Sequence, residues 1–522
     1  MAKSRLKQIA RISLICASLV FATSEIAGAS ISTSGSTKPN SSKANYSKAS
    51  AKTNATITIG FTLEPVSLDI TGVAGQAIPQ VLLNNVYEGL LKVENSGKIV
   101  PSIAESYTVS ANGLVYTFKL AKTKFHDGAN LTSADVVWSF NRVLDPKSTA
   151  VLPTQKQQFS TIASITAPNA SSVVITLKDR DNDFLFNLTQ RGGVIFKTGT
   201  TDFATKANGT GPFKFGNWNR GNSITLERND SYRATKALAK TVIFRYILDA
   251  TALSNAILSG QIDIMSTVQK PELLSVFKGR KDLKISSGTT NGEVTLGMNN
   301  SKAPLNNIKV RQAIRQALNK KALIKTAWAG YGLEIGSFVP PTDAWYEDLS
   351  KTFPYDVQAA KNLLKQAGYP NGFAVTLDIP PAPYAEASQE FIVASLKKIG
   401  IIVTIKPVAW GEWLDRIFTK ANYDMTIVAH VERSDMSIYA NPNYYFRYNS
   451  AEYQALIKKA GSARTPAAQA ESLKKAARLL SSESVSDWLW LIPNLHVVKK
   501  SVTGFPQNDV GDAYSVAAIA KD

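Results

Sequence analysis

The sequence predicts an α/β fold built from two or three domains. From residue 296 to residue 429, helical and strand patterns alternate, and this repeated spacing is typical of a parallel-rich sheet covered by helices. Residues 101–146 add two alternating runs, a turn and a capped helix in unbroken order. With 522 residues, of which 44% are hydrophobic, the chain is long enough for domains of about 150 residues each.

The first 29 residues predict a signal peptide. An apolar stretch spans residues 12–22, and Ala27-Gly28-Ala29 fits the small-residue pattern of a cleavage site. The apolar stretch is too short to cross a bilayer. We therefore expect an exported protein that starts near Ser30 and works in the periplasm or at the cell surface. The basic residues of the signal are Lys3, Arg5, Lys7 and Arg11.

Cys16 is the only cysteine, and it lies inside the apolar stretch. Ser13 and Ile15 stand where a lipidation motif needs an aliphatic residue and a small one, so we do not expect a lipid anchor. Cleavage near Ser30 removes Cys16, which leaves no thiol for a disulfide or for catalysis. Residues 30–54 are rich in Ser, Thr, Ala and Lys and predict a disordered linker.

The formal net charge of the whole chain is +19. The predicted signal peptide contributes a net charge of +3 and the linker a net charge of +4. The folded part therefore carries about +12. This charge is spread among both signs, without a dense basic block or an aromatic reading surface. Nucleic-acid binding is therefore not expected, whereas peripheral contact with an anionic membrane or cell wall is.

Local patterns place the elements of the first half. Asn112-Gly113 favours a tight hairpin turn, and Thr132 with Asp135 forms a capping box before a helix that ends at Asp145-Pro146. Gly128 supplies the turn between hairpin and helix. The other elements predicted here are strands at 56–61, at 164–177 around Pro168-Asn169, at 213–218, 223–228, 241–248 and 261–264, and helices at 76–91 and 251–259.

The second half shows the helix–strand alternation most clearly. Asp356 caps a helix that ends at Gly368. The remaining predicted elements are strands at 373–379, 401–407, 423–429 and 487–492, and helices at 385–399, 411–420, 451–460 and 466–484.

The stretch PSIAESYTVSANGLVYTFKLAKTKFHDGANLTSADVVWSFNRVLDP carries a specific resemblance. It is similar to the pattern AES…DG.TYTF.L…KFHDG.PLTA.DV.WS..R..DP of the family 5 solute-binding proteins of ATP-binding-cassette importers, the dipeptide, oligopeptide and nickel type. The segments NNVYEGLL, GTGPFK and LGMNNSKAPLNNIKVRQAIRQALNKKALI resemble further parts of that family. The resemblance covers nearly all of residues 55–510.

The resemblance implies a two-lobed periplasmic-binding-protein-like fold with an additional inserted lobe. Lobe I would comprise residues 55–86, 209–300 and 488–522, the inserted lobe II residues 87–208, and lobe III residues 301–487. The family encloses a ligand between lobes I and III by hinge closure. It captures solutes, catalyses nothing and delivers its ligand to the transmembrane subunits of a permease, and we expect a monomer.

The residues themselves suggest no catalytic centre. The three histidines, His126, His430 and His496, lie far apart in the sequence and lack the spacing of a zinc site. Neither a nucleophile elbow nor a phosphate-binding loop is present. We therefore expect no catalytic residue, metal or cofactor, a structural hydrogen bond for His126, and a packing or surface position for His496.

The loop 429–449, AHVERSDMSIYANPNYYFRYN, is the candidate for ligand contact. His430 ends a predicted strand, where ligands of open α/β sheets usually bind. In the family's peptide binders an Asp of this loop pairs with the α-ammonium of the peptide. Asp435 matches this role first and Glu432 second, because a buried ammonium needs a paired carboxylate. Asp435 and Arg433 as a solvated pair is the alternative.

Aromatic residues and one further carboxylate complete the predicted site. Trp413 matches a family Trp that follows a strand, and its flat ring would cover a ligand at small entropy cost, with core packing as the alternative. Glu64 follows the first strand, where the family places a ligand-facing loop. Tyr444 and its neighbour Tyr445 would line the pocket or cover the third lobe.

Taken together, we expect an extracytoplasmic binding protein that captures short peptides for an importer. A metal chelate or an oligosaccharide is the alternative within this class. From other classes, a secreted hydrolase would need a nucleophile or base that the sequence does not supply, and a wall-associated adhesin is suggested by the basic linker.

Overall fold

The computed structural model of the protein describes residues 54–522 except 267, 269 and 432–434. The predicted signal peptide and nearly all of the predicted linker lie outside the described residues. The described chain forms two compact units, here called unit 1 and unit 2. Unit 1 consists of Thr289–Ala463 and Ala467–Pro493, and unit 2 of the described residues before Thr289 with Arg464–Pro466 and Asn494–Asp522. The division into three lobes remains a prediction.

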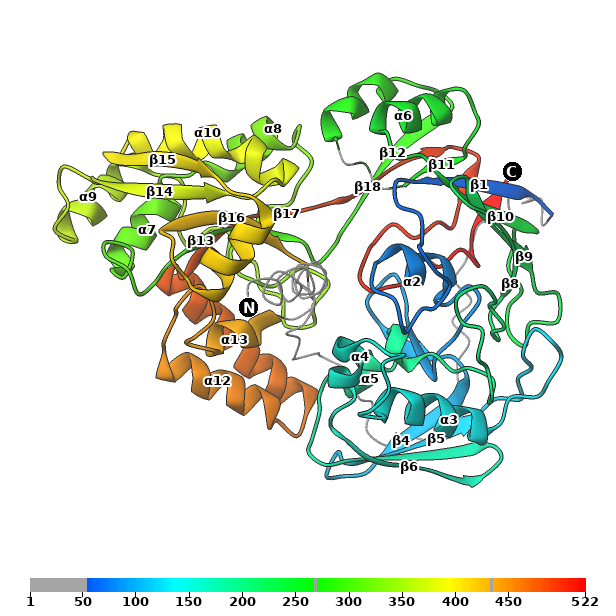
Figure 1. The fold of residues 1–522 in the computed structure, drawn as a ribbon. Helices are drawn as coiled ribbons and strands as arrows, with labels where there is room; N and C mark the ends of the chain where they lie inside the picture. The colour runs from blue at the N-terminus through cyan, green and yellow to red at the C-terminus, as the bar shows by residue number, and fades with distance from the viewer. Residues whose placement is uncertain (1–53, 267, 269, 432–434) are drawn as a thin grey trace, which may run out of the picture. The chain divides into compact units, whose positions relative to one another are not determined.

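Unit 2 contains a seven-stranded mixed sheet, in the order β12-β18-β11-β1-β10-β9-β8 (Figure 1). β1 (Thr56–Phe61) pairs in parallel with β10 (Thr241–Tyr246) and with β11 (Ile264–Met265). The carboxyl ends of these three strands therefore share one edge of the sheet. The remaining neighbours are antiparallel, and these strands are β8 (Phe213–Asn219), β9 (Ser223–Arg228), β12 (Leu283–Gly288) and β18 (Asn494–Lys499).

The second large sheet of unit 2 is antiparallel, in the order β4-β5-β7-β6, and the apolar face of α3 (Ser133–Leu144) packs on it. The predicted hairpin turn is confirmed, because Gly113 has a φ of 72°. The predicted capping box is confirmed as well, because the Thr132 N–H donates to the Asp135 carboxylate at 2.8 Å. The strands are β4 (Ala104–Val109), β5 (Val115–Leu120), β6 (Ile162–Asn169) and β7 (Ser172–Leu177).

The GTGP segment at 209–212 has a structural role. The Gly211 N–H donates to the Val86 carbonyl at 2.9 Å, and a Cβ atom on Gly209 would lie 1.9 Å from that same oxygen. Only glycine allows so close a backbone approach. The His126 ring also binds this segment, since Nδ1 accepts from the Gly209 N–H at 3.3 Å and Nε2 lies 3.0 Å from the Gly211 carbonyl. The predicted structural hydrogen bond of His126 is confirmed.

Unit 1 contains a five-stranded sheet in the order β15-β14-β16-β13-β17. β14 (Phe373–Ile379) is parallel to β15 (Ile401–Pro407) and to β16 (Met425–His430). β13 (Glu293–Met298) is antiparallel to β16 and to β17 (Ser486–Leu491). Four of the five strands therefore run in one direction, as the expected parallel-rich sheet requires, whereas β13 runs opposite to them and makes both of its pairings antiparallel.

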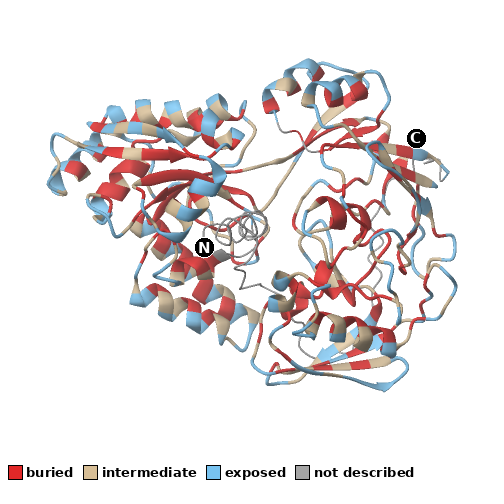
Figure 2. Ribbon diagram, in the orientation of Figure 1, coloured by how far each residue is buried: buried red, intermediate tan, exposed pale blue. Residues whose placement is uncertain are grey.

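Helices cover this sheet and a second, aromatic core lies beside it. In Figure 2 the strands β13, β14 and β16 are largely buried, whereas the helices are buried on one side and exposed on the other. Among the helices that the structure describes, none has both the length and the apolar character of a membrane span. The helices of unit 1 are α7 (Ile308–Gln316), α8 (Lys320–Ala327), α9 (Val357–Gln366), α10 (Pro383–Lys397), α12 (Ala451–Gly461) and α13 (Pro466–Glu483).

Two predicted helices and one predicted turn were wrong in detail. The helix predicted at 76–91 is only α2 (Ala77–Leu82), because Leu83 is extended and Asn84 has a φ of 60°. The helix predicted at 411–420 is a short α11 (Trp410–Glu412) followed by a π-helix at Trp413–Thr419. The turn predicted at Pro168-Asn169 lies at residues 170–171 instead, since β6 continues to Asn169.

Candidate functional site

The predicted strand end at His430 belongs to β16, the central strand of the five-stranded sheet of unit 1. His430 is the last residue of β16, and its partner across the antiparallel pair is Glu293, the first residue of β13. Both side chains are buried, with 7% and 1% of their surface exposed. The fold thus brings an ionisable ring and a carboxylate together where a ligand of an open sheet usually binds.

An aromatic cluster surrounds the His430 ring. Nε2 of His430 lies 2.9 Å from the Tyr445 hydroxyl, and the two rings are stacked at 6.0 Å between centroids. Phe338 packs edge-on against His430 at 5.3 Å. Tyr444, which is half-buried, contacts Tyr445 at 5.1 Å and His430 at 6.4 Å. His430 and Tyr444, both predicted for the site, are therefore close neighbours.

Trp413 lies in the core beneath this cluster. It is only 2% exposed, and its indole N–H donates to the Thr426 hydroxyl at 3.0 Å. Its ring packs against Tyr445 at 5.7 Å between centroids. Trp410, which is 37% exposed, stands edge-on to it at 5.6 Å. The structure therefore places Trp413 in core packing, and a direct contact with ligand remains a prediction.

Of the two carboxylates predicted for the loop, the structure describes the position of Asp435 but not that of Glu432. Asp435 is the first residue of a 3₁₀ helix, Asp435–Ala440, which follows β16 by a few residues. This helix is anchored by Tyr439, whose ring stacks on Phe446 at 4.8 Å between centroids. Glu432 and Arg433, the other predicted residues of this loop, lie outside the described residues.

Glu64 belongs to unit 2 and is engaged in local hydrogen bonds. Its carboxylate accepts from the Trp218 indole N–H at 2.7 Å and from the Gly221 N–H at 3.0 Å. The Arg220 guanidinium stacks over the Trp218 ring at 3.4 Å, which adds a cation–π contact to the same loop. Glu64 therefore holds the loop after β1 to the turn after β8, and its contact with ligand remains a prediction.

The sequence did not single out Glu293 or Phe338 for this site, whereas it names Tyr445, together with Tyr444, as lining the pocket or covering the third lobe. Glu293 could have been suspected, because a Glu at the start of an otherwise apolar strand, EVTLGM, is unusual in a buried sheet. Phe338 carries no such local signal. Phe338 and Tyr445 both reach His430 through long-range packing, which periodicity does not reveal.

Comparison with known proteins agrees with this architecture. The sequence profile of the bacterial extracellular solute-binding proteins, family 5 Middle, matches residues 98–455. Heme-binding protein A of Haemophilus influenzae is 29% identical over 500 residues, which cover 86% of this chain and 88% of that protein. The glutathione-binding protein GsiB of Escherichia coli is 27% identical over 373 residues, covering 69% of this chain and 71% of that protein.

A solved structure shows the same fold. The periplasmic binding protein DppA of Helicobacter pylori, in complex with the peptide STSA, aligns with a TM-score of 0.71 and 25% identity. The alignment covers 90% of this chain and 98% of that one. Each of these relatives is named as a binding protein. The predicted fold class and the predicted family are thus confirmed, and the chain belongs to the family 5 extracellular solute-binding proteins of ATP-binding-cassette importers.

Proposed function

We propose that this protein captures short peptides outside the cytoplasm and delivers them unchanged to the permease of an importer. The observation that carries the proposal is the similarity to DppA, which was solved with a bound tetrapeptide and matches nearly the whole chain. The relative named for glutathione binding supports the same ligand class, since glutathione is itself a small peptide-like molecule. Family 5 binding proteins work in the periplasm or outside the cell, in accord with the predicted signal peptide.

The first step of binding is recognition of the peptide's α-ammonium. We assign this role to Asp435, at the start of the 3₁₀ helix after β16, with Glu432 as the second candidate. An ammonium removed from water needs a paired carboxylate, because a buried charge without one costs several kcal/mol. Arg433 in the same loop would meet an opposite charge on the ligand.

The aromatic cluster supports this step by fixing the strand end. His430 is held by the Tyr445 hydroxyl, and Trp413 packs on Tyr445 from the core side. Tyr444 keeps exposed surface and is the ring of the cluster that would cover a peptide directly. Glu64, in unit 2, would contribute through the loop after β1. The closure of lobes around the ligand stays a prediction from the family resemblance.

A metal chelate is the second candidate ligand. The relative named for heme binding covers more of this chain than the glutathione-binding relative does, at 29% identity. Heme is a flat iron chelate, and an aromatic cluster at a strand end offers a surface on which such a ring would stack. Hemin is therefore the probe against which peptides have to be compared.

Calorimetric titration tests the proposal with two forms of one tripeptide. One form has a free amino terminus, and the other has an acetylated one. We expect Asp435→Asn to weaken binding of the free-amine peptide by about tenfold or more, and binding of the acetylated peptide by less than about threefold. Asp415→Asn is the matched control, since Asp415 is exposed and forms an ion pair with the exposed Lys420. An equal loss for both peptides would overturn the assignment of Asp435. Tight binding of hemin with no binding of either peptide would overturn the peptide ligand.

A further inference from the structure

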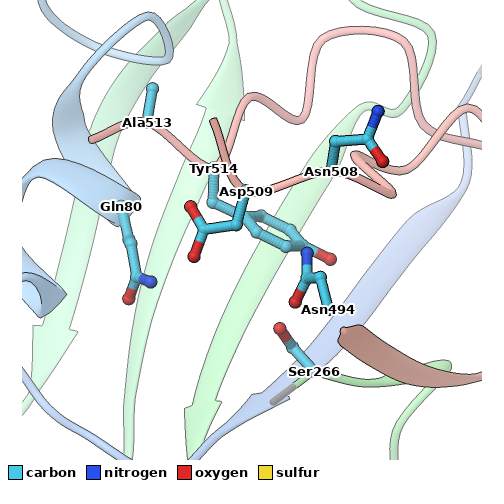
Figure 3. Close-up of a pocket in the computed structure, with 7 residues that line it drawn as sticks. All are labelled: Gln80, Ser266, Asn494, Asn508, Asp509, Ala513 and Tyr514. Carbon is cyan, nitrogen blue, oxygen red and sulfur yellow. The ribbon is translucent and has the colours of Figure 1, made fainter. Parts of the chain in front are cut away.

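Unit 2 contains a small polar cavity at the carboxyl edge of its large sheet. Its volume is about 20 Å³, which is room for one water-sized group. Ser266 directly follows β11, and β11 runs parallel to β1, so the cavity lies where α/β sheets usually bind ligands. Figure 3 shows the side chains gathered around this space: Gln80, Ser266, Asn494, Asn508, Asp509, Ala513 and Tyr514.

The hydroxyl of Tyr514 reaches this cavity and has no hydrogen-bond partner of normal geometry among the described residues. Tyr514 is 93% buried, since only 7% of its surface is exposed, and Oη makes no hydrogen bond of normal geometry within the described part of the chain. Burial raises the pKa of Tyr514 well above its usual range, and the nearby Ser266 hydroxyl opposes this shift only in part. A buried hydroxyl without a hydrogen-bond partner is unfavourable unless a ligand or a water satisfies it.

Asp509 brings a negative charge to the same space. Its carboxylate forms no ion pair with any of the described residues. Burial raises the pKa of Asp509 to about 6, and the neighbouring Asp512 adds to this shift. Asp512 itself lies 3.6 Å from Arg191, so that cation is directed to Asp512 and not to Asp509. Asp509 is half-buried, and its carboxylate is an acidic group in the wall of the cavity that no described cation pairs with.

The neutral walls of the cavity offer oxygen atoms. The amide nitrogen of Asn494 donates to the Gln507 carbonyl at 2.9 Å, so the oxygen of this amide is the group that Asn494 can offer to the cavity. The hydroxyls of Ser266 and Tyr514 can both accept a hydrogen bond. Figure 3 shows Ser266, Asn494 and the Tyr514 hydroxyl near one another, and the Asp509 carboxylate across the Tyr514 ring from them, on the side of Gln80.

We propose that this cavity binds one ammonium group, with Asp509 as the charged partner and Tyr514, Ser266 and Asn494 as neutral acceptors. An ammonium nitrogen has the size of a water molecule and donates several hydrogen bonds, which suits a water-sized space with several acceptors. A divalent cation would need six or more oxygen ligands and further carboxylates. The group is either a free ammonium ion or the primary ammonium of a larger solute, and in the second case the site would serve the proposed peptide-binding function.

Thermal unfolding of the purified exported protein at pH 7.5 tests this inference. The probes are ammonium chloride, methylammonium chloride and tetramethylammonium chloride at equal ionic strength. We expect ammonium to raise the unfolding midpoint by about 1–2 °C over tetramethylammonium, which is too large for the cavity and donates no hydrogen bond. A rise with methylammonium as well identifies the source as a solute's amine, and a rise with ammonium alone identifies the free ion. Equal midpoints in all three salts would overturn the proposal.

Three variants distinguish ammonium binding in the cavity from a general effect of salt on stability. Asp509→Asn removes the charge at constant shape. Tyr514→Phe removes only a hydroxyl that hydrogen-bonds to none of the described residues, so this variant should fold normally. We expect Asp509→Asn to abolish the ammonium effect and Tyr514→Phe to reduce it by half or more. Asp282→Asn, at an exposed pair with Arg280, should leave the effect unchanged. If Asp509→Asn fails to fold, Tyr514→Phe decides alone. An undiminished ammonium effect in Tyr514→Phe would overturn the assigned site.

Discussion

Nε2 of His430 lies 2.9 Å from the hydroxyl of Tyr445, and the planes of the two rings differ by only 7°. Both side chains are almost fully buried at the carboxyl end of β16. This pair ties the end of the strand to the loop that returns from the 3₁₀ helix at Asp435–Ala440. It therefore fixes the base of the loop to which the ligand contact is assigned.

Removing the Tyr445 hydroxyl should weaken the fold locally. Tyr445→Phe leaves a buried His430 nitrogen without this hydrogen bond, which typically costs about 1–2 kcal/mol. Urea unfolding followed by circular dichroism measures the change. Tyr355→Phe is the control, because Tyr355 is 44% exposed and should change the free energy of unfolding by less than about 0.5 kcal/mol. Equal values for the two variants would show that the His430–Tyr445 hydrogen bond does not stabilise the strand end.

Variants of the two neighbouring tryptophans, Trp410 and Trp413, distinguish a role in core packing from a role in ligand contact. Trp413 is buried and donates to Thr426, so Trp413→Phe should lower the free energy of unfolding by about 1–3 kcal/mol. Trp410 is 37% exposed, so Trp410→Phe should change stability by less than about 1 kcal/mol. Parallel calorimetry with peptide shows which ring touches the ligand. A stable Trp413→Phe variant that binds peptide much more weakly would mean that Trp413 acts in binding and not in packing.

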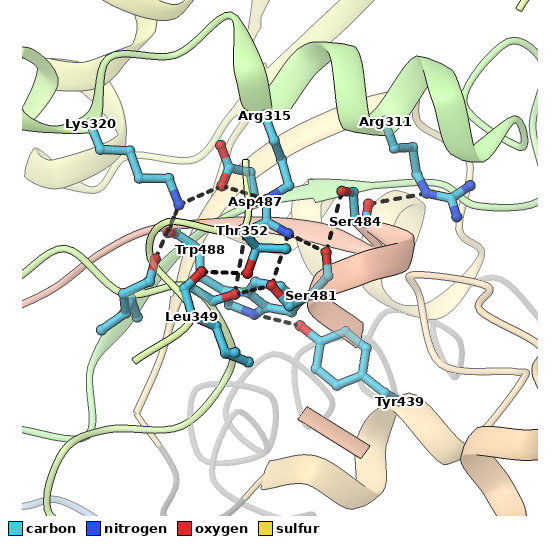
Figure 4. Close-up of polar contacts among 12 residues, drawn as sticks. Arg311, Arg315, Lys320, Leu349, Thr352, Tyr439, Ser481, Ser484, Asp487 and Trp488 are labelled. Atoms are coloured by element: carbon cyan, nitrogen blue, oxygen red, sulfur yellow. Dashed lines mark hydrogen bonds and ion pairs between the residues drawn. The ribbon is translucent and has the colours of Figure 1, made fainter. Parts of the chain in front are cut away.

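A buried ion cluster lies at β17, which is an edge strand of the sheet of unit 1. Asp487 is fully buried, and one of its oxygens lies 2.8 Å from Lys320 Nζ and 3.4 Å from Arg315 Nε (Figure 4). Arg315 also donates to the carbonyls of Ser481 and Gly336, which joins α7 to the end of α13. The QAIRQALNKK segment, which resembles the family, thus supplies both cations of this buried cluster.

Neutralising Asp487 should be strongly destabilising. Asp487→Asn leaves two buried cations without their carboxylate, and removal of one partner from a buried ion pair costs about 3–5 kcal/mol. Differential scanning calorimetry measures the loss, and Asp415→Asn serves as the exposed control with less than about 0.5 kcal/mol expected. A variant as stable as the control would contradict the stabilising role of the cluster.

His496 should make the fold sensitive to acid. It lies on β18, packed against Phe505 at 5.4 Å, and it is fully buried, which agrees with the packing position expected from the sequence. Burial lowers the pKa of His496 to about 4, and the Asn494 backbone opposes this only in part. Because the unfolded chain binds the proton more readily, the contribution of His496 to stability is full above about pH 6.5 and falls as the pH drops toward 4.

His496→Phe removes this titration while keeping an apolar ring in place. We expect the difference in free energy of unfolding between the protein and the variant to shift by about 2–3 kcal/mol between pH 7 and pH 4. Urea unfolding at a series of pH values measures this difference. A constant difference over that range would show that His496 titrates as it does in the unfolded chain.

Local sequence signals predicted the elements well. The strands expected at 373–379 and 401–407 are β14 and β15 with the same bounds, and Asp356 caps α9 by accepting from the Ala359 N–H at 2.9 Å. These predictions rest on period-two alternation and on side chains that bond within their own turn. The helix expected at 76–91 failed because Asn84 adopts a positive φ, which no apolar spacing signals.

Long-range pairing could not be predicted in the same way. β18 enters the large sheet of unit 2 between β11 and β12, although more than 190 residues separate it from either strand in sequence. The site shows the same limit: the position of His430 at a strand end followed from its pattern, but its bond to Tyr445 did not. The burial of Trp413 likewise depends on aromatic neighbours that only the folded chain brings together.

The most direct test of the central claim is native mass spectrometry of the exported protein after incubation with a defined mixture of tripeptides. Capture without chemistry predicts a one-to-one complex, and the peptide released from it on denaturation keeps its original mass after prolonged incubation. Peptide fragments that accumulate with time, or the absence of any complex across the whole mixture, would contradict the account.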